Sequence, residues 1–333
     1  MSRQTVLVAG GAGYIGSHVV LALRDCGFRL VVVDDLSTGF RDAIPGDVAF
    51  HEGDVRDAGL ISGILRRHDV GAVMHLAASV SAPESVADPL KYYSNNTWAC
   101  LALAEACLAG GVERFIFSSS AAVYGAVAGS PIAEDAPKLP ISPYGASKLI
   151  AEAMLGDLSK AHPHFRVMCL RYFNVGGADT RGRAGQRKRG AADLIHLVVQ
   201  SALGVSGPVA ICGDDYDTRD GTGERDYIHV CDLAEAHAAA LDYLDAGGVT
   251  ATLNCGYGRG YTVLEVVAVM ETILGRKLAT RRAPRRPGDP ASAVSDVTRL
   301  KATLDWRPRL DSLGQILSTA LAWQSREVGR TSI

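Results

Sequence analysis

The chain has 333 residues, 47% of them hydrophobic and 21% charged, and its net charge is −2 at pH 7. At roughly 150 residues per domain, this length allows two domains or one large α/β unit. The composition excludes a disordered chain, and the lack of basic excess argues against nucleic acid or an anionic membrane as a partner. No run of about 18 apolar residues predicts a membrane span.

The seven cysteines are odd in number and scattered, and no two of them are spaced as CxxC. This pattern argues against both a disulfide framework and a zinc site. The chain enters an apolar run at Val6 without the charged region, hydrophobic region and cleavage site of a signal peptide. We therefore expect a cytoplasmic protein with no bound metal.

Short apolar runs alternate with segments of helical spacing in the first half of the chain. The runs are residues 5–9, 30–33, 72–76, 115–117 and 167–170, and the helical segments are 17–26, 58–68, 93–109 and 143–161. Continuous apolar strands separated by helices are typical of a parallel sheet that is covered on both faces. Residues 1–174 are therefore predicted to form a Rossmann-type, doubly wound α/β domain.

The pattern changes after Asn174, and residues 175–333 are predicted to form a second, smaller α/β domain. Some of this later chain is expected to return to the first domain. Loops are predicted at 176–190, 214–223 and 281–290, helices at 193–203 and 261–275, and a strand end with a helix at 227–244, while 295–303 and 310–324 complete the chain.

A glycine-rich segment, Gly10-Gly11-Ala12-Gly13-Tyr14-Ile15-Gly16, follows the first predicted strand and precedes a helix. Glycine permits positive φ and lets a pyrophosphate approach the backbone closely, and a helix N-terminus favours its negative charge. A tight turn alone would also need glycine, and the spacing is three and three rather than GxGxxG. The strand–turn–helix context favours a dinucleotide site.

Asp34 and Asp35 end the second predicted strand, and Asp34 lies 18 residues after Gly16. This is near the spacing of the acid that binds the adenosine ribose in dinucleotide-binding folds. A carboxylate there accepts hydrogen bonds from the ribose hydroxyls and repels a 2′-phosphate. No arginine occurs between Asp35 and Arg41, so NAD is favoured over NADP.

Tyr144 and Lys148 are one helical turn apart, and the preceding Ser142 and Pro143 suit the N-cap and the first helical position. A free tyrosine has a pKa of about 10, but a nearby ammonium and an oxidised nicotinamide would stabilise its phenolate. This pair alone is a weak signal. It is strengthened upstream, where a predicted strand ends in three serines, and Ser120 among them can orient a substrate oxygen.

Together these segments resemble the extended short-chain dehydrogenase/reductase family and, within it, the UDP-glucose (UDP-galactose) 4-epimerases. The resemblance covers nearly the whole chain. The matching segments are Gly10–His18, Glu52–Arg56, Tyr92–Asn96, Phe117–Gly125, Ser142–Gly145, Leu170–Asn174, Asp220–Val230 and Arg285–Asp289. The segment 220–230 is far more specific than the dinucleotide-binding turn.

The resemblance implies NAD as the cofactor, a UDP-sugar as the substrate, and a role for each matching residue. On the NAD side it implies Gly10, Gly13, Tyr14, Ile15, Gly16, Asp34, Asp54, Val55, Leu76, Ala77, Ala78, Ser79, Asn95, Ser118, Tyr144, Lys148 and Phe173. On the UDP-sugar side it implies Ser120, Tyr144, Asn174, Asp193, Leu194, Arg225, Arg286, Asp289 and Ala293. Ser120 would orient the sugar O4, Tyr144 would act as the base, and Lys148 would hold the nicotinamide ribose.

The implied reaction is NAD-dependent epimerisation at C4 of a UDP-hexose, UDP-galactose to UDP-glucose, through a 4-keto sugar. A small residue at Ala293, near the sugar C2 substituent in the family, would also admit UDP-GlcNAc and UDP-GalNAc. A UDP-xylose/UDP-arabinose 4-epimerase stays open. A nucleotide-sugar 4,6-dehydratase is less favoured because Ala121-Ala122 stand where an Asp-Glu pair is typical. A non-catalytic dinucleotide-binding regulator would not need Tyr144, Lys148 and Ser120 together. This sequence has all three, so that alternative is less favoured.

Three features depart from the family pattern. Val80 stands where many members have Lys, and Asp193 stands where Asn or His lies near the substrate diphosphate. An acid at position 193 would repel phosphate unless its side chain caps the following helix. The segment 181–189 contains five basic residues and no acid. We expect a solvated loop there, with a lid facing the phosphates as the alternative.

His18, His75 and His229 match no pattern of metal ligands and are expected to be structural. The family often dimerises through two helices per subunit, so we expect a homodimer. The segments 93–109 and 143–161 are candidates for that interface, although both have enough apolar residues for packing within one chain.

Overall fold

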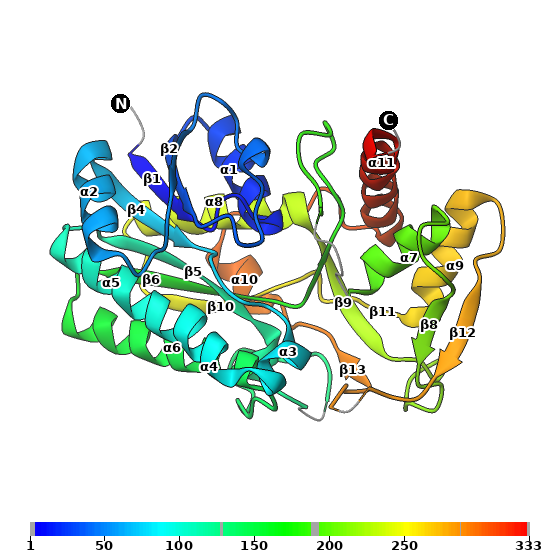
Figure 1. Cartoon of the computed structure of the whole chain (residues 1–333). Helices are drawn as coiled ribbons and strands as arrows, with labels where there is room; N and C mark the ends of the chain where they lie inside the picture. Colours follow the sequence, from blue (N-terminus) through cyan, green and yellow to red (C-terminus); the bar gives the residue numbers. More distant parts are fainter. Residues whose placement is uncertain (1–3, 127–128, 188–192, 287, 332–333) are drawn as a thin grey trace.

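The computed structural model describes residues 4–126, 129–187, 193–286 and 288–331. Its larger lobe is built on a seven-stranded parallel sheet in the order β10-β6-β5-β4-β1-β2-β3 (Figure 1). The strands are β1 (Thr5–Ala9), β2 (Arg29–Asp34), β3 (Ala49–Glu52), β4 (Val70–His75), β5 (Arg114–Ser120), β6 (Arg166–Tyr172) and β10 (Ala251–Cys255). The predicted doubly wound α/β fold is confirmed, and the strand order reverses between β1 and β4, where such folds bind ligands.

Helices cover both faces of this sheet because its strands are apolar on both sides. One face packs against α1 (Tyr14–Asp25) and α8 (Val230–Asp245), and the other packs against α2 (Ala58–His68), α5 (Ala99–Ala109) and α6 (Pro143–Ala161). Successive side chains of a strand point to opposite faces. In β1, Val6 and Val8 therefore belong to one buried core, and Leu7 and Ala9 belong to the other.

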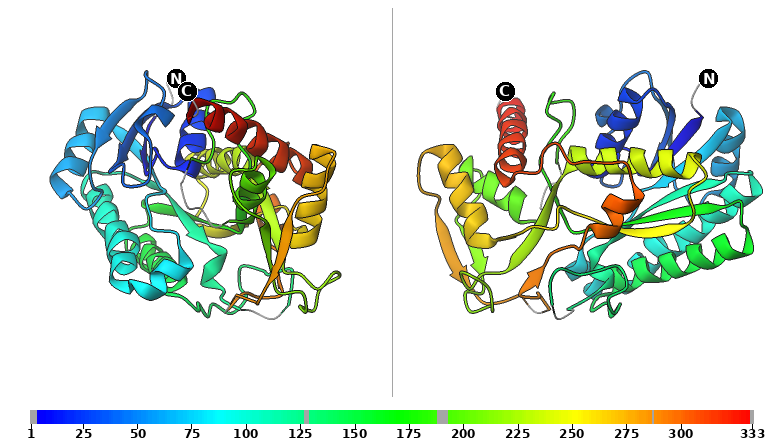
Figure 2. Two further views of the ribbon diagram at one scale, coloured as in Figure 1. Left: turned by 45° about the vertical axis from the view of Figure 1, so that its right-hand side comes forward. Right: turned by 180° about the vertical axis from the view of Figure 1, so that it is seen from behind.

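The smaller lobe lies beside the sheet and carries the C-terminal helix (Figures 1 and 2). Its central strand is β9 (Glu224–His229), which pairs with β7 (Asn174–Gly176), β11 (Gly260–Thr262) and β13 (Ser292–Ala293), while β8 (Val209–Cys212) pairs with β12 (Thr280–Ala283). Its helices are α7 (Leu194–Ala202), α9 (Val263–Leu274) and α11 (Leu313–Thr331). They pack around a separate core that includes Val198, Met270 and Leu317.

Several shorter elements lie between these strands and helices. They are α3 (Ala82–Ala87), α4 (Pro89–Tyr92), the π-helical η2 (Tyr93–Trp98), α10 (Thr298–Thr303), and the 3-10 turns η1 (Arg41–Ala43) and η3 (Ala121–Val123). Three elements from the second half of the sequence, α8, β10 and α10, belong to the larger lobe. The predicted division between residues 1–174 and 175–333 therefore does not separate the two lobes. It stays a prediction about which residues bind which ligand.

The structure corrects several predicted elements. The segment 281–290 begins in strand β12 rather than in a loop, because its first residues pair with β8. The segment 93–109 is not one α-helix, since its first six residues are π-helical. The strands β3, β8 and β10 were not among the predicted elements. Over the part of the chain that the structure describes, no helix is both long and apolar enough to cross a membrane.

Candidate active site

The glycine-rich turn joins β1 to α1 beside the point where the strand order reverses, and Gly13 is the N-cap of α1. Gly10 has a φ of +81°, and a Cβ there would lie 2.4 Å from the Ala77 nitrogen. A Cβ on Gly16 would lie 2.1 Å from the Gly10 carbonyl oxygen. The first turn of α1 contains no acidic residue, so this tightly closed turn suits an anion at the helix N-terminus.

Asp34 ends β2 beside this turn and is 8% exposed. Its two carboxylate oxygens accept hydrogen bonds from the backbone N–H groups of Ala12 and Leu36, both at 2.9 Å. Burial raises the pKa of Asp34, and the two hydrogen bonds oppose that rise. The carboxylate is therefore fixed at the strand end, next to the turn that Ala12 belongs to.

Asp54 and Val55 follow β3, the neighbouring strand. Both carboxylate oxygens of Asp54 accept from Arg56 Nε at 2.9 Å, and Arg56 Nη1 donates to Ser94 Oγ at 2.7 Å. The hydrogen bond from Arg56 holds the pKa of Asp54 below its usual range. Val55 is buried in the core that covers one face of the sheet. The loop after β3 is therefore fixed by the packing of Val55 and by the hydrogen bonds of Arg56.

The segment Leu76–Ser79 follows β4 and is half-buried. Asn96 anchors it: the Ser79 N–H donates to Asn96 Oδ1 at 2.8 Å, and Asn96 Nδ2 donates to Ser79 O and to Ser147 Oγ, both at 3.0 Å. Asn95 Nδ2 donates to Ser79 Oγ at 3.2 Å. The sequence reasoning named Asn95 and missed the structural part played by Asn96, although the adjacent pair of asparagines marks the position.

Tyr144 lies in the first turn of α6, where Ser142 Oγ accepts from the Gly145 N–H at 3.2 Å as the predicted N-cap. Ser120 is the last residue of β5 and lies close enough to Tyr144 for the two side chains to interact. Burial raises the pKa of Tyr144, and the interaction with Ser120 opposes that rise. The structure therefore places the predicted base and the predicted hydroxyl near each other.

Lys148 lies one turn further along α6 and is 2% exposed. Its Nζ donates to the Ser118 carbonyl oxygen at 2.8 Å and lies 4.9 Å from the centroid of the Phe117 ring. Burial lowers the pKa of Lys148 to about 8. The ammonium thus retains its charge at neutral pH, under the strand end that presents Ser120.

A buried ion pair beneath these residues was missed by the sequence reasoning. Arg171 donates to the two carboxylate oxygens of Glu152 at 2.9 and 2.5 Å, and Ser119 Oγ donates to the same carboxylate. Arg171 also donates to Tyr124 Oη at 2.8 Å. Glu152 lies four residues after Lys148, one turn along the same helix face, which is the signal that could have identified it. The pair ties β5, β6 and α6 together.

The residues implied for the UDP-sugar gather around β9. The register pairs Asn174 of β7 with Tyr227, and it pairs Ala293 of β13 with Arg225. Arg225 donates to the Glu224 carbonyl oxygen at 2.8 Å, and its Nη2 lies 3.4 Å from Asp289 Oδ1. The Arg225 side chain is only 17% exposed.

Other implied residues lie around this group. Arg286 is exposed. Phe173 and Ala293 pack against one small buried cluster that includes Val123 and Tyr124, just after the Ser120 strand end. That cluster brings the smaller lobe against the end of β5.

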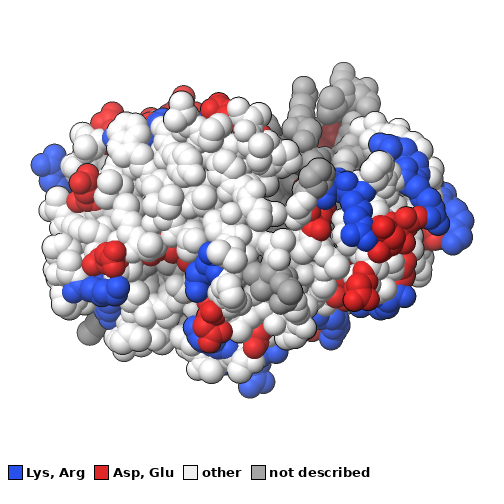
Figure 3. All heavy atoms as spheres, turned by 90° about the horizontal axis from the view of Figure 1, so that it is seen from below, with Lys and Arg blue, Asp and Glu red and all other residues white. Residues whose placement is uncertain are grey.

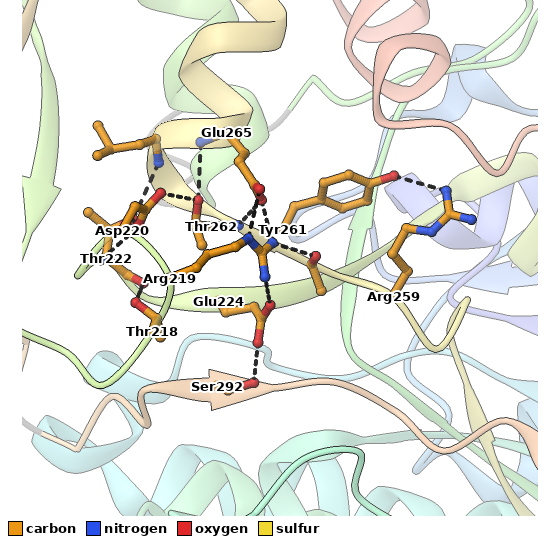
Figure 4. Close-up of polar contacts among 12 residues, drawn as sticks. Thr218, Arg219, Asp220, Thr222, Glu224, Arg259, Tyr261, Thr262, Glu265 and Ser292 are labelled. Atoms are coloured by element: carbon orange, nitrogen blue, oxygen red, sulfur yellow. Dashed lines mark hydrogen bonds and ion pairs between the residues drawn. The ribbon is translucent and has the colours of Figure 1, made fainter.

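A network of side chains fixes the loop before β9 (Figure 4). Arg219 donates to the carboxylates of Glu224 and Glu265 and to the Gly260 carbonyl oxygen. Glu224 also accepts from Ser292 Oγ at 2.6 Å. Asp220 accepts from Thr222 Oγ1 at 2.7 Å and from Thr262 Oγ1. The network therefore joins β9, β11, β13 and α9 around the backbone position of Arg225.

Asp193 is the N-cap of α7. Its Oδ1 accepts from the His196 N–H at 2.9 Å, and its Oδ2 accepts from Gln186 Nε2 at 2.8 Å. Leu194 packs against the core of the smaller lobe. Of the two possibilities left open by the sequence, these contacts support the helix cap.

The expectation of a solvated basic loop is met at Arg181, whose side chain is 63% exposed, but is wrong for Arg183 and Arg187, which are 27% and 17% exposed. Arg181 and Arg183 form ion pairs with Asp25 of α1, and Arg183 also pairs with Asp179 at 2.8 Å. Arg187 pairs with Asp42 of the larger lobe at 2.6 Å and with Glu327 of α11 at 2.9 Å. These guanidinium groups are engaged by carboxylates of both lobes, rather than free to face a phosphate. Lys188 and Arg189 lie outside the described residues.

The three histidines have internal positions. His229 is the N-cap of α8, and its Nε2 contacts Thr319 Oγ1 at 2.9 Å. His18 Nδ1 contacts the Tyr14 carbonyl oxygen at 2.7 Å. His75 is 1% exposed, and burial lowers its pKa to about 3. Among the described residues, no group of His, Cys, Asp and Glu side chains could hold a metal ion.

Comparison with known proteins identifies the family. Residues 6–256 match the NAD dependent epimerase/dehydratase family. The chain belongs to this family. It is 52% identical to a UDP-glucose 4-epimerase of Azospirillum brasilense over 319 residues, 96% of this chain and 91% of the relative.

Two solved structures show how far the likeness extends. A UDP-glucose-4-epimerase from Stenotrophomonas maltophila, with bound NAD and formylated UDP-arabinopyranose, superposes with a TM-score of 0.95 at 37% identity. The match covers 99% of this chain and 100% of that one. The UDP-Glc/GlcNAc 4-epimerase of Campylobacter jejuni superposes with a TM-score of 0.85 at 41% identity, over 97% and 99% of the two chains.

The residues present fit the cofactor of this epimerase/dehydratase family. Gly10 and Gly16 close a turn in which a side chain would clash with backbone, and the acid-free N-terminus of α1 suits the pyrophosphate. Asp34 offers a fixed carboxylate to the adenosine ribose, and a 2′-phosphate would meet its negative charge. The cofactor is accordingly NAD rather than NADP.

Proposed function

We propose that this chain catalyses the NAD-dependent epimerisation of a UDP-hexose at C4, interconverting UDP-galactose and UDP-glucose through a 4-keto sugar. The observation that carries the proposal is that Tyr144 lies near Ser120 and one helical turn from the buried Lys148, at the edge of the sheet that holds the glycine-rich turn. The relatives that are named UDP-glucose 4-epimerase match nearly the whole chain.

In the proposed reaction, Tyr144 takes the proton from the sugar 4-hydroxyl and Ser120 orients the sugar O4. NAD bound at the glycine-rich turn and Asp34 would supply an acceptor for the C4 hydride and a source for its return to the other face of the sugar. Lys148 carries a positive charge at neutral pH because its pKa is about 8, and this charge favours the Tyr144 phenolate. The buried Lys148 ammonium therefore helps Tyr144 to be deprotonated, so that Tyr144 can accept the proton of the sugar 4-hydroxyl.

The remaining roles follow the resemblance. We assign Asp34, Asp54, Val55, Asn95, Ser118 and Phe173, with the Leu76–Ser79 segment, to NAD. Arg225 and Arg286 are assigned to the diphosphate, because two guanidinium groups complement its charge. Asn174, Leu194 and Asp289 are assigned to the UDP-sugar. We further propose that residues 1–174 provide the NAD side, and 175–333 the UDP-sugar side, of one site.

Ala293 supports a second substrate class, the N-acetylated UDP-hexoses. Its side chain lies in the small cluster with Phe173 and Val123, where a larger residue would take up space beside the proposed sugar site. The Campylobacter relative is a UDP-Glc/GlcNAc 4-epimerase. UDP-xylose and UDP-arabinose remain a third class to test. Ala121 and Ala122 provide neither acid nor base for a 4,6-dehydratase.

The test is to incubate the purified protein with UDP-galactose, UDP-GalNAc and UDP-xylose in separate reactions and to separate the products by chromatography. The proposal expects UDP-glucose from UDP-galactose without added oxidant. The Tyr144→Phe variant serves as the control for a contaminating epimerase. Absence of UDP-glucose, or equal conversion by the variant, would overturn the proposal. Release of water with a 4-keto-6-deoxy product would replace it with a dehydratase.

We propose a homodimer formed by the α3–α6 side of the larger lobe. Large apolar side chains are exposed there: Leu90 of α4 at 79%, Trp98 of η2 at 55% and Ile150 of α6 at 46%. Figure 3 shows few charged side chains across the middle of the face seen from below, the side on which α3, α4 and α6 lie in Figure 1. Exposed apolar area of this kind marks association surfaces. Trp98→Glu should yield a monomer in analytical ultracentrifugation, and an unchanged mass would refute the interface.

We propose a cytoplasmic location from the state of the buried cysteines. Cys100, Cys107, Cys169 and Cys255 are buried as thiols, as in proteins that fold under reducing conditions. Retention of the protein in the cytosolic fraction of its source cells would support this placement.

A further inference from the structure

The inter-lobe segment, residues 179–187, runs between the two lobes and takes no part in the reaction proposed above. In Figure 1 it is the green loop between α1 of the larger lobe and α11 of the smaller lobe. Its backbone turns back on itself, because the Asp179 N–H donates to the Ala184 carbonyl oxygen at 2.9 Å and the Gly182 N–H donates to the Asp179 carbonyl oxygen at 2.8 Å. It is therefore a compact turn that can hold its side chains in fixed positions.

One end of the inter-lobe segment is fixed to the smaller lobe. Gln186 Nε2 donates to Asp193 Oδ2, at the N-cap of α7, at 2.8 Å, and the Gln186 carbonyl oxygen accepts from Gln324 Nε2 of α11. A Cβ on Gly185 would lie 2.4 Å from the Trp323 ring, so glycine at this position lets the turn lie directly against α11. The segment therefore keeps a constant position relative to α7 and α11.

Arg187, at the end of this segment, bridges the two lobes. Its Nη1 donates to Asp42 Oδ1 of the larger lobe at 2.6 Å, and its Nε donates to Glu327 Oε2 of α11 at 2.9 Å. The guanidinium also lies 4.9 Å from the centroid of the Phe40 ring. Ion pairs in full contact with water contribute little, but the Arg187 side chain is only 17% exposed and has two carboxylate partners. We therefore expect this bridge to hold the segment around Phe40 and Asp42 in place.

The segment that Arg187 holds lies against the glycine-rich turn. The Phe40 N–H donates to the Ala12 carbonyl oxygen at 3.0 Å, and a Cβ on Gly39 would lie 2.8 Å from the Ala12 Cβ. The Ala12 N–H in turn donates at 2.9 Å to Asp34 Oδ2, of the carboxylate that is assigned above to the adenosine ribose. An unbroken series of contacts therefore leads from Arg187 through the glycine-rich turn to Asp34.

We propose that Arg187 is a positioning residue for NAD. By tying the segment around Asp42 to α11, it keeps the glycine-rich turn and Asp34 in the orientation that binds the adenosine ribose, and bound NAD therefore leaves slowly. This inference rests on the proposed function, since it takes Asp34 as the partner of that ribose. Slow release suits the proposed reaction, in which NAD is regenerated in every cycle, so that no step requires the cofactor to leave.

The test is the rate at which the holoenzyme exchanges its NAD. Protein purified with unlabelled NAD is mixed with an excess of deuterium-labelled NAD, and the nucleotide that stays bound is identified by mass spectrometry over time. We expect Arg187→Met to exchange NAD about fivefold faster, as for the loss of a partly exposed ion pair. The kcat for UDP-galactose at saturating NAD should stay nearly unchanged, because Arg187 contacts Asp42 and Glu327 rather than the proposed catalytic residues.

Two further variants separate this role from a general loss of stability. Arg187→Lys keeps the charge but not the planar fork that reaches both carboxylates, so it should exchange NAD at an intermediate rate. Because the effect acts through Asp34, Arg187→Met should add little to the exchange rate of Asp34→Asn. The double variant is therefore expected to match Asp34→Asn within about twofold.

The matched control is Arg24→Met. Arg24 Nε also donates to a carboxylate, Asp47 Oδ2 at 2.9 Å, but both residues belong to the larger lobe and are exposed. The control removes an arginine and its ion pair without releasing a contact between the lobes. It should leave the rate of NAD exchange unchanged.

Exchange within about twofold of the wild-type rate in Arg187→Met would overturn the proposal, as would equal acceleration by Arg24→Met or multiplicative effects of Asp34→Asn and Arg187→Met. If Arg187→Met fails to fold, Glu327→Gln replaces it, since it removes the α11 half of the bridge and should also speed exchange. An Asp34→Asn variant that holds NAD like the wild type overturns the ribose assignment and this inference together. Failure of the epimerase function alone gives a different result: the wild type then fails to convert UDP-galactose, while the NAD exchange rates keep the expected order.

Discussion

The buried ammonium of Lys148 predicts that Lys148→Met stabilises the cofactor-free protein while abolishing turnover. Lys148 is 2% exposed, and burial lowers its pKa from the ordinary value of 10.5 to about 8. At about 1.4 kcal/mol per pH unit, keeping this group charged at pH 7 costs the folded state about 3 kcal/mol. Methionine fills a similar volume without a charge.

Two losses offset part of this gain. The Ser118 carbonyl oxygen loses its donor, at a cost of about 1 kcal/mol, and the contact with the Phe117 ring contributes up to about 1 kcal/mol more. The net expectation is an increase of about 1–2 kcal/mol in the free energy of unfolding at pH 7. Between about pH 8 and 10.5 the unfolded chain binds more protons at this lysine than the folded chain does. Wild-type stability therefore rises across that window, and the advantage of the methionine variant shrinks.

The assay is urea unfolding of NAD-stripped protein at pH 7 and about pH 9.5. Lys160→Met is the control, because its side chain on the same helix is 81% exposed, and it should change stability little. A Lys148→Met variant that is no more stable than the wild type at pH 7 would refute the reasoning. So would a stability difference that grows as the pH rises.

Three further predictions address the site. The protein should purify with NAD bound, because Asp34 is fixed beside the dinucleotide turn; recovery of NADP by mass spectrometry after denaturation would contradict the cofactor assignment. Tyr144→Phe should bind NAD and UDP normally but lose about 10²–10⁴-fold in turnover, and near-normal epimerisation would assign the base elsewhere. Asp193→Asn should leave the KM for the UDP-sugar within about threefold, because asparagine also caps helices; a marked loss of affinity would show that the carboxylate itself matters.

The elements that the sequence predicts best are those with local signals. Residues 143–161 form α6 with the expected bounds because Ser142 caps the helix and Pro143 suits its first position. The same holds for the turn at Gly10 and for Asp34, whose partners Ala12 and Leu36 are close to the strand ends. These features depend on a few adjacent residues, so their spacing is enough to identify them.

The features that escaped prediction depend on residues far apart in the sequence. The basic loop was expected to be solvated because its acidic partners are distant: Arg183 pairs with Asp25, and Arg187 pairs with Asp42 and Glu327. Strand β12 was hidden because Arg281 and Arg282 stand on a two-stranded sheet, where exposed positions tolerate charge. Neither local composition nor periodicity reports which distant segment will lie alongside.

We predict that the small side chain of Ala293 lets N-acetylated sugars enter the site. Its strand pairs it with Arg225, and it packs in the cluster that holds Phe173 and Tyr124, so the position lies between the proposed diphosphate site and the catalytic strand end. UDP-GlcNAc should therefore be epimerised detectably, and Ala293→Tyr should abolish this while sparing UDP-glucose. An added group in such a pocket changes discrimination by only about 1–3 kcal/mol, so we expect activity on both sugars rather than strict selectivity. Ala293→Ser is the size-matched control and should keep both activities. If the wild type converts UDP-galactose fully and forms no UDP-GalNAc from UDP-GlcNAc, neighbouring side chains close the space and a small residue at position 293 does not decide the specificity.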